Sequence, residues 1–326
     1  MSPLLHGDYT IAWVCALPLE MAAAKVMLDE IHRALPKPNT DPNTYILGNL
    51  NRHNIVITCL PSGIYGTISA AAVISHLLST FSRIQFGLMV GIGGGVPSST
   101  NDIRLGDVVV SKPSGKYSGV IQYDYGKTVQ GGRFEQVGML NNPPQVLLTH
   151  IAYLQAEEMT RRATTISSLM VDVLEQYPDM QETFAPPCQD MDYFFRSSYH
   201  HTNKGSNCKL VCDKAQLVHR QPRDTRAPRI HYGLIASGDQ VIKDSEARDR
   251  LAQQLGIICF EMEAAGLMNQ LQTLVIRGIC DYCDSHKQKE WQGYAALAAA
   301  AYTKGSRLRP RCICKLYDRT TIGRFA

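Results

Sequence analysis

Apolar residues along this chain gather in short continuous runs that alternate with stretches of helical spacing. The runs at residues 9–15, 85–91 and 274–280 are rich in strand formers, and an uninterrupted apolar run is typical of a strand buried on both faces. Helical spacing follows at 21–35 and 67–79. Strands and helices that alternate in this way predict an α/β fold, with helices on both faces of a mixed, mostly parallel sheet.

The same patterns place further elements along the rest of the chain. Further strands are expected at 44–50, 55–60, 105–111, 230–239 and 256–260, and near Val120 and Phe134. Further helices are expected at 144–159, 167–176, 245–254, 261–268 and 291–304. Glycines follow the apolar run at 85–91, and residues 91–95 are expected to form a loop where the backbone approaches a ligand.

The regular pattern is interrupted once. Between about residues 177 and 229 the chain is irregular and contains Pro, Cys, Asp, Arg and paired His, which indicates an insertion. The 326 residues are 44% hydrophobic, which suffices for a substantial core. We therefore predict one α/β/α sandwich domain over residues 8–305, with the insertion at about 177–229. The basic, aperiodic tail at 306–326 is expected to be peripheral.

Charge and hydropathy exclude two classes of partner. Lys and Arg number 33 and Asp and Glu 29, and the basic excess lies after about residue 200 and forms no stripe, so we expect no nucleic-acid polymer. No run of about 18 apolar residues and no secretory leader pattern occurs, so we expect no membrane partner. The expected location is the cytoplasm.

The ten cysteines do not by themselves indicate disulfides or a metal. Four of them lie inside apolar runs, where a free thiol behaves as a small hydrophobic residue, namely Cys15, Cys59, Cys259 and Cys280. Cys208 and Cys212, with His200 and His201 just upstream, have the chemistry of zinc ligands. Their spacing is loose, however, and no second pair is well placed in the sequence. We therefore expect no metal and no other cofactor.

Common nucleotide-binding and hydrolase signatures are missing. The chain has no GxxxxGK[ST] sequence, and the stretch GIGGGV lacks the third glycine of a dinucleotide fingerprint. There is no GxSxG elbow that would supply a serine nucleophile. These absences argue against a P-loop enzyme, a Rossmann dehydrogenase and an α/β-type serine hydrolase.

Acidic and glycine-rich segments stand at the carboxyl ends of several predicted strands, where ligands bind in open α/β sheets. They are Glu20, residues 91–95, residues 237–239, the pair Glu261 and Glu263, and Asp281. Each has a structural alternative, because Glu20 or the pair can favour a helix N-terminus and Asp281 can cap a helix. Their joint occurrence indicates a site, because buried carboxylates cost stability unless they have a task.

Six segments in order carry a resemblance to a known family. The segments ALPLE, GIGGGV, LGDVVVS, GLIASGDQVI, FEMEAAG and VIRGICD resemble the nucleoside phosphorylase/nucleosidase superfamily. The chain is most similar to methylthioadenosine/S-adenosylhomocysteine nucleosidases and to fungal-type nucleoside phosphorylase-like domains, which are often joined to NACHT or ankyrin-repeat modules. The resemblance covers about residues 8–305 except the insertion, and the pairing of EMEAAG with VIRGICD is its most specific part.

The resemblance implies cleavage of the N-glycosidic bond of a purine nucleoside through an oxocarbenium-like transition state. Asp281 matches the family's acid at purine N7, and for this role burial and neighbouring carboxylates must favour its protonated form. Glu263 matches the glutamate that accepts both ribose hydroxyl hydrogens, with Met262 beside it. Glu20 matches the carboxylate that positions the attacking water, and Arg277 the arginine next to it.

The resemblance also implies contacts for the rest of a nucleoside. Base contacts fall on Asp239, Val241 and Ile242, and the sugar and nucleophile loop on Gly91, Ile92, Gly93 and Gly94. Independently of the resemblance, the basic residues Lys287, Arg223 and Arg226 are candidates for a 5′-phosphate contact, although solvated surface charge is the favoured interpretation. This chain departs from the usual pattern at Ile92 and at Cys280, where nucleosidases usually carry serine.

Three functions remain open from the sequence. Water is favoured as nucleophile, because phosphorylases hold phosphate with arginines that the stretches WVCALPLE and GLMVGIGGG lack, and Glu20 would repel phosphate. The expected activity is therefore a purine nucleosidase for adenine nucleosides or their 5′-phosphates, including ATP. The alternatives are a phosphate-dependent phosphorylase and a non-catalytic nucleotide-sensing module. The resemblance also implies a homo-oligomer, with a dimer favoured.

Overall fold

The strands form one large sheet and one short hairpin. The computed structural model describes residues 3–132, 134–160, 165–188, 191–201 and 208–307. Its strands are β1 (Ile11–Cys15), β2 (Glu30–Ile31), β3 (Tyr45–Leu50), β4 (His53–Cys59), β5 (Phe86–Gly95), β6 (Val108–Ser111), β7 (Val120–Gln122), β8 (Gly126–Thr128), β9 (Phe134–Gln136), β10 (Ile230–Ser237), β11 (Ile257–Glu261) and β12 (Thr273–Asp281). The hairpin consists of β8 and β9.

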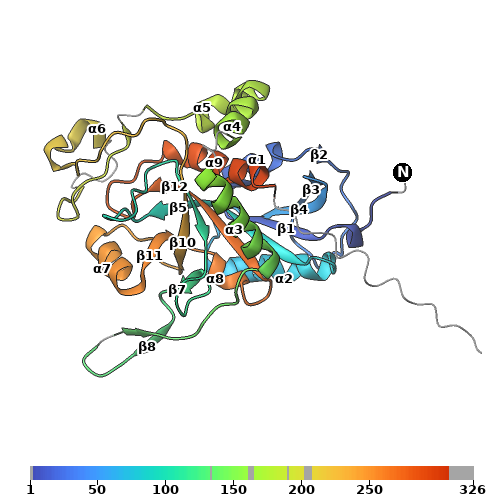
Figure 1. Ribbon diagram of the computed structural model, residues 1–326. Helices are drawn as coiled ribbons and strands as arrows, with labels where there is room; N and C mark the ends of the chain where they lie inside the picture. Colours follow the sequence, from blue (N-terminus) through green and yellow to red (C-terminus); the bar gives the residue numbers. More distant parts are fainter. Residues whose placement is uncertain (1–2, 133, 161–164, 189–190, 202–207, 308–326) are drawn as a thin grey trace, which may run out of the picture.

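Helices connect most of these strands. They are α1 (Pro18–Val26), α2 (Thr67–Thr80), α3 (Gln145–Thr160), α4 (Thr165–Gln176), α5 (Gln181–Phe184), α6 (Cys208–Val211), α7 (Ser245–Leu255), α8 (Ala264–Leu267) and α9 (Trp291–Gly305). In Figure 1, α1 and α9 lie on one side of the sheet and α2 and α8 on the other, so both faces are covered. The predicted α/β/α arrangement is confirmed.

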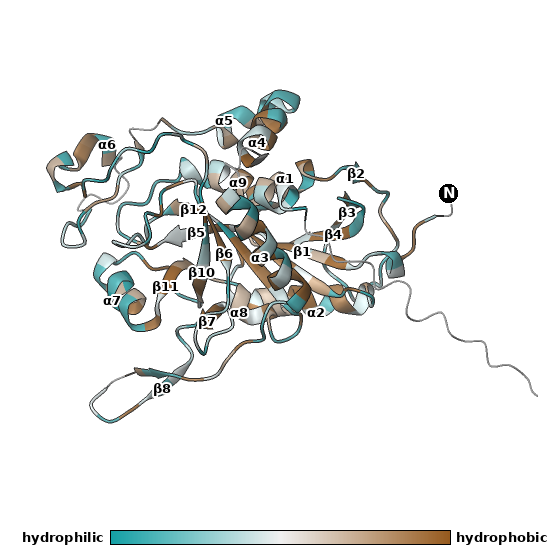
Figure 2. Cartoon of the chain, viewed as in Figure 1, coloured by the Kyte–Doolittle hydropathy of each residue, from teal (hydrophilic) through white to brown (hydrophobic). Residues whose placement is uncertain are grey.

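The large sheet is mixed and mostly parallel, as predicted. Its strands run in the order β11-β10-β6-β12-β5-β1-β4-β3-β2, with β7 beside β10. Six of its pairings are parallel, and all five residues of β1 are buried. Figure 2 shows hydrophobic residues concentrated on the central strands and hydrophilic residues on the outer helices. The uninterrupted apolar runs are therefore the strands at the centre of the sheet.

Residues 91–95 are strand, which corrects the prediction of a loop. β5 continues through them and pairs in parallel with β12 as far as Gly94. The same end of β5 pairs antiparallel with β11, through Cys259 with Gly95 and Phe260 with Gly94. The sheet therefore curls until β11 meets β5, and this brings the ends of β5, β11 and β12 together.

The alanine-rich helix α9 packs directly on β12 and β5. A side chain on Gly278 of β12 would collide with the backbone carbonyl of Ala295, so glycine and small residues allow the close approach. Nearly every residue of α9 is buried. This helix therefore supports, from behind, the strand that ends in Asp281.

The helix predicted at 21–35 is shorter in the structure, where α1 ends at Val26 and residues 30–31 form β2. The Asp29 carboxylate accepts from the backbone N–H of Asn51 and from the Lys304 ammonium, which draws the chain onto β3. Helical spacing alone could not reveal these distant partners, because a tertiary contact overrides a weak helix preference.

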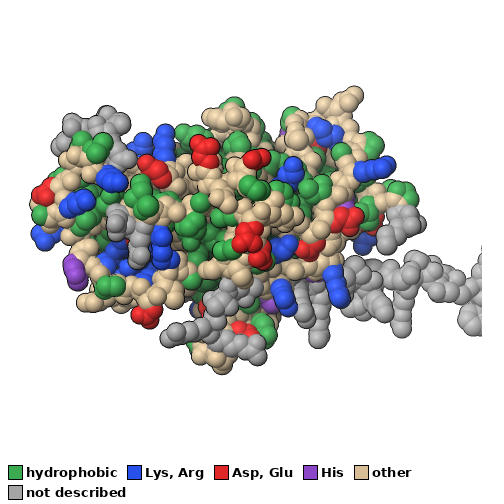
Figure 3. All heavy atoms as spheres, turned by 90° about the horizontal axis from the view of Figure 1, so that it is seen from above, with side chains coloured by type: hydrophobic (Ala, Val, Ile, Leu, Met, Phe, Trp, Pro, Cys, Tyr) green, Lys and Arg blue, Asp and Glu red, His purple; other side chains and the backbone are tan. Residues whose placement is uncertain are grey.

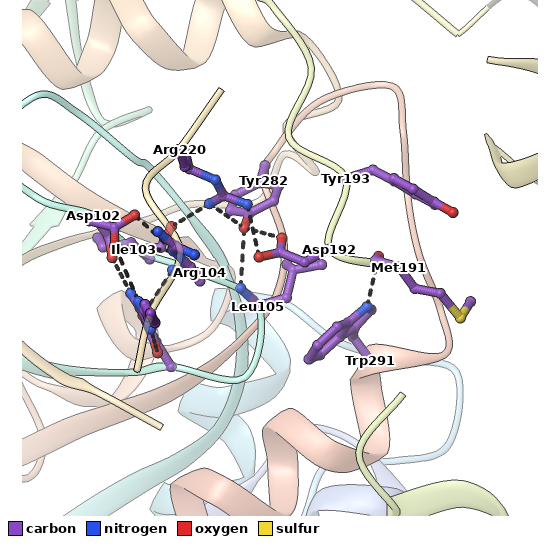
Figure 4. A network of polar contacts seen from close by, with 12 residues as sticks. Asp102, Ile103, Arg104, Leu105, Met191, Asp192, Tyr193, Arg220, Tyr282 and Trp291 are labelled. Atoms are coloured by element: carbon purple, nitrogen blue, oxygen red, sulfur yellow. Dashed lines mark hydrogen bonds and ion pairs between the residues drawn. The ribbon is translucent and has the colours of Figure 1, made fainter. Parts of the chain in front are cut away.

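The irregular insertion packs closely against the segment after β12. The Tyr282 hydroxyl donates to Asp192 at 2.5 Å, and Arg220 bonds both of these residues (Figure 4). At the start of α9, the Trp291 indole donates to the carbonyl of Met191 at 3.2 Å. The domain limits stay a prediction, and all but two residues of the predicted tail lie outside the described residues.

The visible surface carries mixed charge. On the face in Figure 3, acidic and basic side chains are interspersed, and no stripe of one sign crosses it. Among the helices of the described ranges, none has the length and apolarity needed to cross a membrane.

Candidate active site

A pocket of about 260 Å³ opens at the converging ends of β5, β11 and β12. Most of the residues expected to form the site line it: Glu20, Ile92, Gly93, Gly94, Val241, Ile242, Met262, Glu263, Arg277, Asp281 and Lys287. Gly91, Asp239, Arg223 and Arg226 are not among its lining residues. Tyr65, Gln240 and Phe260, to which the sequence assigned no role, also line it, as does Glu261, which was named only as one of the acidic pair.

Glu20 is the third residue of α1, and its carboxylate turns back toward the start of the helix. One oxygen accepts from the backbone N–H groups of Ala16 (2.6 Å) and Leu17 (3.0 Å), and the other accepts from that of Ile92 (2.8 Å). Both interpretations of this residue therefore hold, because Glu20 caps a helix and lines the pocket. Burial raises the pKa of Glu20, although Arg277 and these N–H groups oppose the shift.

Gly91 lies behind the pocket rather than in its wall. A side chain at this position would collide with the Glu20 carboxylate and would lie 2.8 Å from Nη1 of Arg277. Glycine is therefore needed here because two buried charged groups occupy the space beside the strand.

Arg277 lies at the centre of three carboxylates. Its Nη2 forms an ion pair with Glu261 and lies 3.5 Å from Glu263, and its Nη1 donates to the carbonyl of Ile92 at 3.3 Å. The side chain is 1% exposed. Burial opposes its charge, but Glu261, Glu263 and Glu20 together raise the pKa of Arg277. One guanidinium is thus matched by more than one negative charge.

Glu261 positions the other carboxylates, a role that the sequence did not reveal. Its oxygens accept from the backbone N–H groups of Glu263 and Ala264 and bind Arg277. Its spacing from Glu263 placed both at the end of β11, but the sequence did not distinguish the one that binds the arginine. The residue that Glu261 binds is Arg277, four positions before Asp281 on β12, and the sequence did not show this pairing.

Burial shifts the pKa of the Glu263 carboxyl group toward neutral pH. Burial and the nearby Glu261 and Glu20 raise its pKa to about 7, while Arg277 opposes the shift. Glu263 can therefore change its charge near neutral pH. A carboxylate in this position can accept hydrogen bonds from hydroxyl groups and stabilise positive charge.

Asp281 ends β12 and faces the pocket beside a cation. Its Oδ1 accepts from the backbone N–H of Cys283 at 2.8 Å and lies 2.6 Å from Nζ of Lys287. From the sequence, neighbouring carboxylates were expected around Asp281, but the charged group in contact with it is the Lys287 ammonium. Burial opposes the charge of Lys287, and Asp281 raises the pKa of Lys287 above its usual value.

Apolar side chains line another part of the pocket. Val241, Ile242, Met262 and Phe260 contribute to it, and Phe260 is held edge-on against Tyr123. Such a surface suits a flat, largely apolar group such as a purine.

Asp239 is occupied elsewhere. Its carboxylate accepts from the backbone N–H and the hydroxyl of Thr67, both at 2.8 Å, and so caps the start of α2. It fixes the segment before Val241 and Ile242 without reaching the pocket itself.

The two arginines considered for a 5′-phosphate lie in a different hollow, formed by the insertion and the start of β6. Arg223 forms a bidentate ion pair with Asp107, at 2.7 and 2.8 Å, and Arg226 donates to the carbonyl of Pro187. Lys287 is thus the one of the three candidates that reaches the pocket. The two arginines lie away from the pocket because their part of the insertion packs beside the start of β6.

The sequence of the chain decides its family. The phosphorylase superfamily profile matches residues 10–307. The chain belongs to this superfamily. The resemblance drawn from the six segments is thereby confirmed.

Relatives of this member of the phosphorylase superfamily include two kinds of protein. A nucleotide-binding leucine-rich repeat-like protein of Hyaloscypha variabilis is 46% identical over 92% of the chain and 29% of its own length. ATP nucleosidase Cap17 of Escherichia coli is 24% identical over 92% of the chain and 51% of its own length. The chain thus spans about half or less of these relatives.

A solved structure shares the fold along almost its whole length. A mutant of 5′-methylthioadenosine/S-adenosylhomocysteine nucleosidase of Helicobacter pylori, with 5′-methylthioadenosine in the active site, superposes with a TM-score of 0.57. It is 13% identical to this chain and covers 91% of it, and 97% of the nucleosidase is covered in turn. Curated relatives and structural neighbours of this phosphorylase-superfamily chain thus include nucleosidases, which are hydrolases of N-glycosyl bonds.

One group of side chains outside the pocket has the composition of a metal site. His201, Cys208, Cys212 and His286 each direct a ligand atom at the same point. From the sequence no metal was expected, because no second pair of ligands was well placed near Cys208 and Cys212. In the folded chain His286, 74 residues beyond Cys212, lies beside these cysteines.

Proposed function

We propose that this chain hydrolyses the N-glycosidic bond of purine nucleosides or their 5′-phosphates. The observation that carries the proposal is the convergence of Glu20, Glu263 and Asp281 on one pocket around the buried Arg277. The nucleosidases among the relatives support the same reaction class.

Glu263 and Asp281 act on opposite sides of the bond that breaks, Glu263 on the sugar and Asp281 on the base. Glu263, in its carboxylate form, accepts hydrogen bonds from the ribose hydroxyls and stabilises the positive charge that develops on the sugar. Asp281, in its carboxylic acid form, donates its proton to N7 as the bond to the sugar breaks, so the base leaves neutral and Asp281 becomes a carboxylate. The ammonium of Lys287, 2.6 Å from Asp281, stabilises the carboxylate that this proton transfer leaves on Asp281.

Water is the nucleophile in this proposal: its oxygen forms the new bond to C1′ of the sugar, and the Glu20 carboxylate accepts the proton that the water loses. The Glu20 carboxylate receives three backbone hydrogen bonds, and a carboxylate has about four acceptor positions, so one position remains for a water molecule. Arg277 cannot attract phosphate, because Glu261, Glu263 and Glu20 already surround its charge. A phosphate dianion placed beside these carboxylates would be repelled.

Adenine nucleosides, including ATP, are the substrates we propose first. The apolar lining accepts a purine, and the relative named as an ATP nucleosidase supports a 5′-triphosphate. In the described part of the pocket, the cation other than Arg277 is Lys287, so the phosphates would extend toward solvent.

The proposal is tested by incubating the purified chain with adenosine, inosine, guanosine, AMP and ATP in phosphate-free buffer, with free base measured by chromatography. We expect base from at least one adenine substrate and a lower rate from guanosine. If none of the five compounds releases base, the chain is not a purine nucleosidase.

A second candidate is nucleotide sensing without turnover. The Lys287 ammonium lies 2.6 Å from Oδ1 of Asp281 and so occupies an oxygen that would have to face a base, and one relative is a nucleotide-binding leucine-rich repeat-like protein. This candidate predicts ligand binding by calorimetry without release of base. Base release that Asp281→Asn abolishes would exclude it.

A further inference from the structure

Two cysteines and two histidines from distant parts of the sequence meet beside the loop that follows β12. Their four ligand atoms all lie within 4.8 Å of one another. Nδ1 of His201 lies 3.1 Å from Sγ of Cys212 and 3.8 Å from Sγ of Cys208. Nδ1 of His286 lies 3.5 Å and 3.7 Å from the same two sulfur atoms.

These distances fit one tetrahedral ion. Zinc binds sulfur at about 2.3 Å and imidazole nitrogen at about 2.0–2.1 Å, so a tetrahedron places nitrogen and sulfur roughly 3.5 Å apart. The four nitrogen–sulfur distances lie on both sides of that value. Two cysteines with two histidines are also a ligand set of structural zinc sites.

The histidine that comes from outside the insertion is oriented for metal binding. Its Nε2 lies 3.1 Å from the carbonyl oxygen of Tyr199, and because a carbonyl only accepts, Nε2 must carry the hydrogen. The lone pair of Nδ1 therefore points at the two sulfur atoms. The ring is 2% exposed and is stacked on Phe195 at 4.1 Å and on Tyr199 at 5.4 Å. A hydrogen bond that fixes the tautomer is typical of metal-binding histidines.

We propose that His201, Cys208, Cys212 and His286 bind one zinc ion. Two thiolates and two neutral imidazoles balance the charge of Zn²⁺, so the bound site is neutral, as a largely buried site requires. Binding releases the two thiol protons to solvent and involves no change of oxidation state.

The site connects the insertion to the pocket. Three ligands belong to the insertion, and His286 lies in the loop between Asp281 and α9, next to Lys287. The backbone N–H of His201 also donates to the Ser285 hydroxyl at 2.8 Å. Zinc therefore fixes the loop that carries Lys287, and through it the cation beside Asp281. The four ligands act by positioning and do not touch the reacting atoms.

The first test is the metal content of the purified chain after dialysis against metal-free buffer, measured by mass spectrometry of the elements. We expect about one zinc per chain in the wild type and much less in Cys208→Ser/Cys212→Ser. Cys188→Ser, at an exposed thiol, and Cys312→Ser/Cys314→Ser, in the tail, are matched controls that should keep the zinc. Zinc that persists in the double ligand variant, or is lost in the tail variant, would overturn the assignment.

A second measurement covers a ligand variant that fails to fold. Wild-type chain is stripped with a chelator and titrated with Co²⁺, which absorbs strongly in the visible range when it is tetrahedral and bound to thiolate. We expect that absorption at one equivalent, its loss on addition of zinc, and a lower melting temperature of the stripped chain. A wild type that binds neither metal, or a Cys208–Cys212 disulfide in its intact mass, would contradict the proposal. These readouts do not depend on nucleosidase activity.

Discussion

The carboxylate side of the pocket, formed by Glu20, Glu261, Glu263 and Arg277, is held differently from its loop side, residues 281–287. Strand ends and backbone N–H groups fix the carboxylate side, and its charges are buried and mutually paired. The loop side leaves the sheet at Asp281 and is held by the insertion, through Tyr282 with Asp192 and through the group around His286.

This difference separates two tasks. The carboxylate side is held by backbone N–H groups at strand and helix ends and by Arg277 of β12, and an array of negative charge fixed in this way suits a positively charged sugar intermediate. In the proposed reaction the loop side contacts the purine base, which enters and leaves the pocket. The geometry of the loop side depends on the insertion, which lies between α4 and β10. We therefore expect the carboxylate side to determine the type of reaction, and the insertion to determine the rate and the substrate preference.

The largest effect is expected from removing the acid on the loop side. Asp281→Asn should lower kcat about 10²- to 10⁴-fold, because proton transfer to the leaving group contributes about that much. KM should change little, since the apolar lining remains. Base release is measured for this variant and for the exposed control Asp172→Asn, which should match the wild type. Equal rates in the wild type and Asp281→Asn would remove Asp281 from the reaction.

The next effect concerns the stability of the carboxylate side. Arg277→Met leaves three carboxylates without their counter-charge, and breaking a buried ion pair costs about 3–5 kcal/mol. Burial already raises the pKa of Glu20 and of Glu263, and the substitution should raise both further. A raised carboxyl pKa gives stability below the unfolded value and loses it as pH rises through the folded value. The free-energy loss should therefore be larger at pH 8 than at pH 5.

Denaturant unfolding at both pH values measures this loss, with Arg250→Met at an exposed position as the control. A variant as stable as the wild type at pH 8 would show that Arg277 does not balance the carboxylates.

A smaller effect is expected at Glu263. Its pKa of about 7 means that the carboxylate form appears as pH rises through neutrality. The kcat/KM of the wild type should therefore rise between pH 6 and pH 8. Glu263→Gln should lower kcat/KM about 100-fold, as for the loss of one stabilising group, and remove that rise. Exposed Glu246→Gln serves as control, and an unchanged pH profile in Glu263→Gln would assign the titration to another group.

The smallest effect distinguishes two roles of Lys287. If its ammonium supports Asp281, Lys287→Met lowers kcat about tenfold for adenosine and ATP alike. If it binds a 5′-phosphate, KM rises for ATP alone. We expect the first result, since Lys287 lies 2.6 Å from Asp281. Lys289→Met, two residues along the same loop and exposed, is the control.

The sequence was most informative about the carboxylate side. Uninterrupted apolar runs predicted the buried strands, and the carboxyl ends of those strands located Glu20, Glu263 and Asp281, because ligands bind where such strands end. Residues 91–95 were predicted as a loop because glycine is rare inside strands, but here they extend β5 and make room for Glu20 and Arg277.

The loop side could not be predicted in the same way. Lys287 and Asp281 are separated by an irregular stretch whose course depends on the insertion, and no periodicity describes it. The fourth candidate metal ligand, His286, lies 74 residues from Cys212, so sequence spacing could not join them. Arg223 was considered for a 5′-phosphate on its charge alone, with solvated surface charge as the alternative, whereas the fold pairs it with Asp107. Contacts between distant irregular segments leave no local pattern.

In the proposed reaction, the carboxylate side accepts water and excludes phosphate, and the loop side protonates the leaving base. This division of roles is tested most directly by the products formed from adenosine or ATP in excess inorganic phosphate, followed by phosphorus NMR and chromatography. We expect free adenine at the rate seen without phosphate, together with ribose or its 5′-triphosphate. Ribose 1-phosphate among the products, or base release that requires added phosphate, would contradict this division of roles.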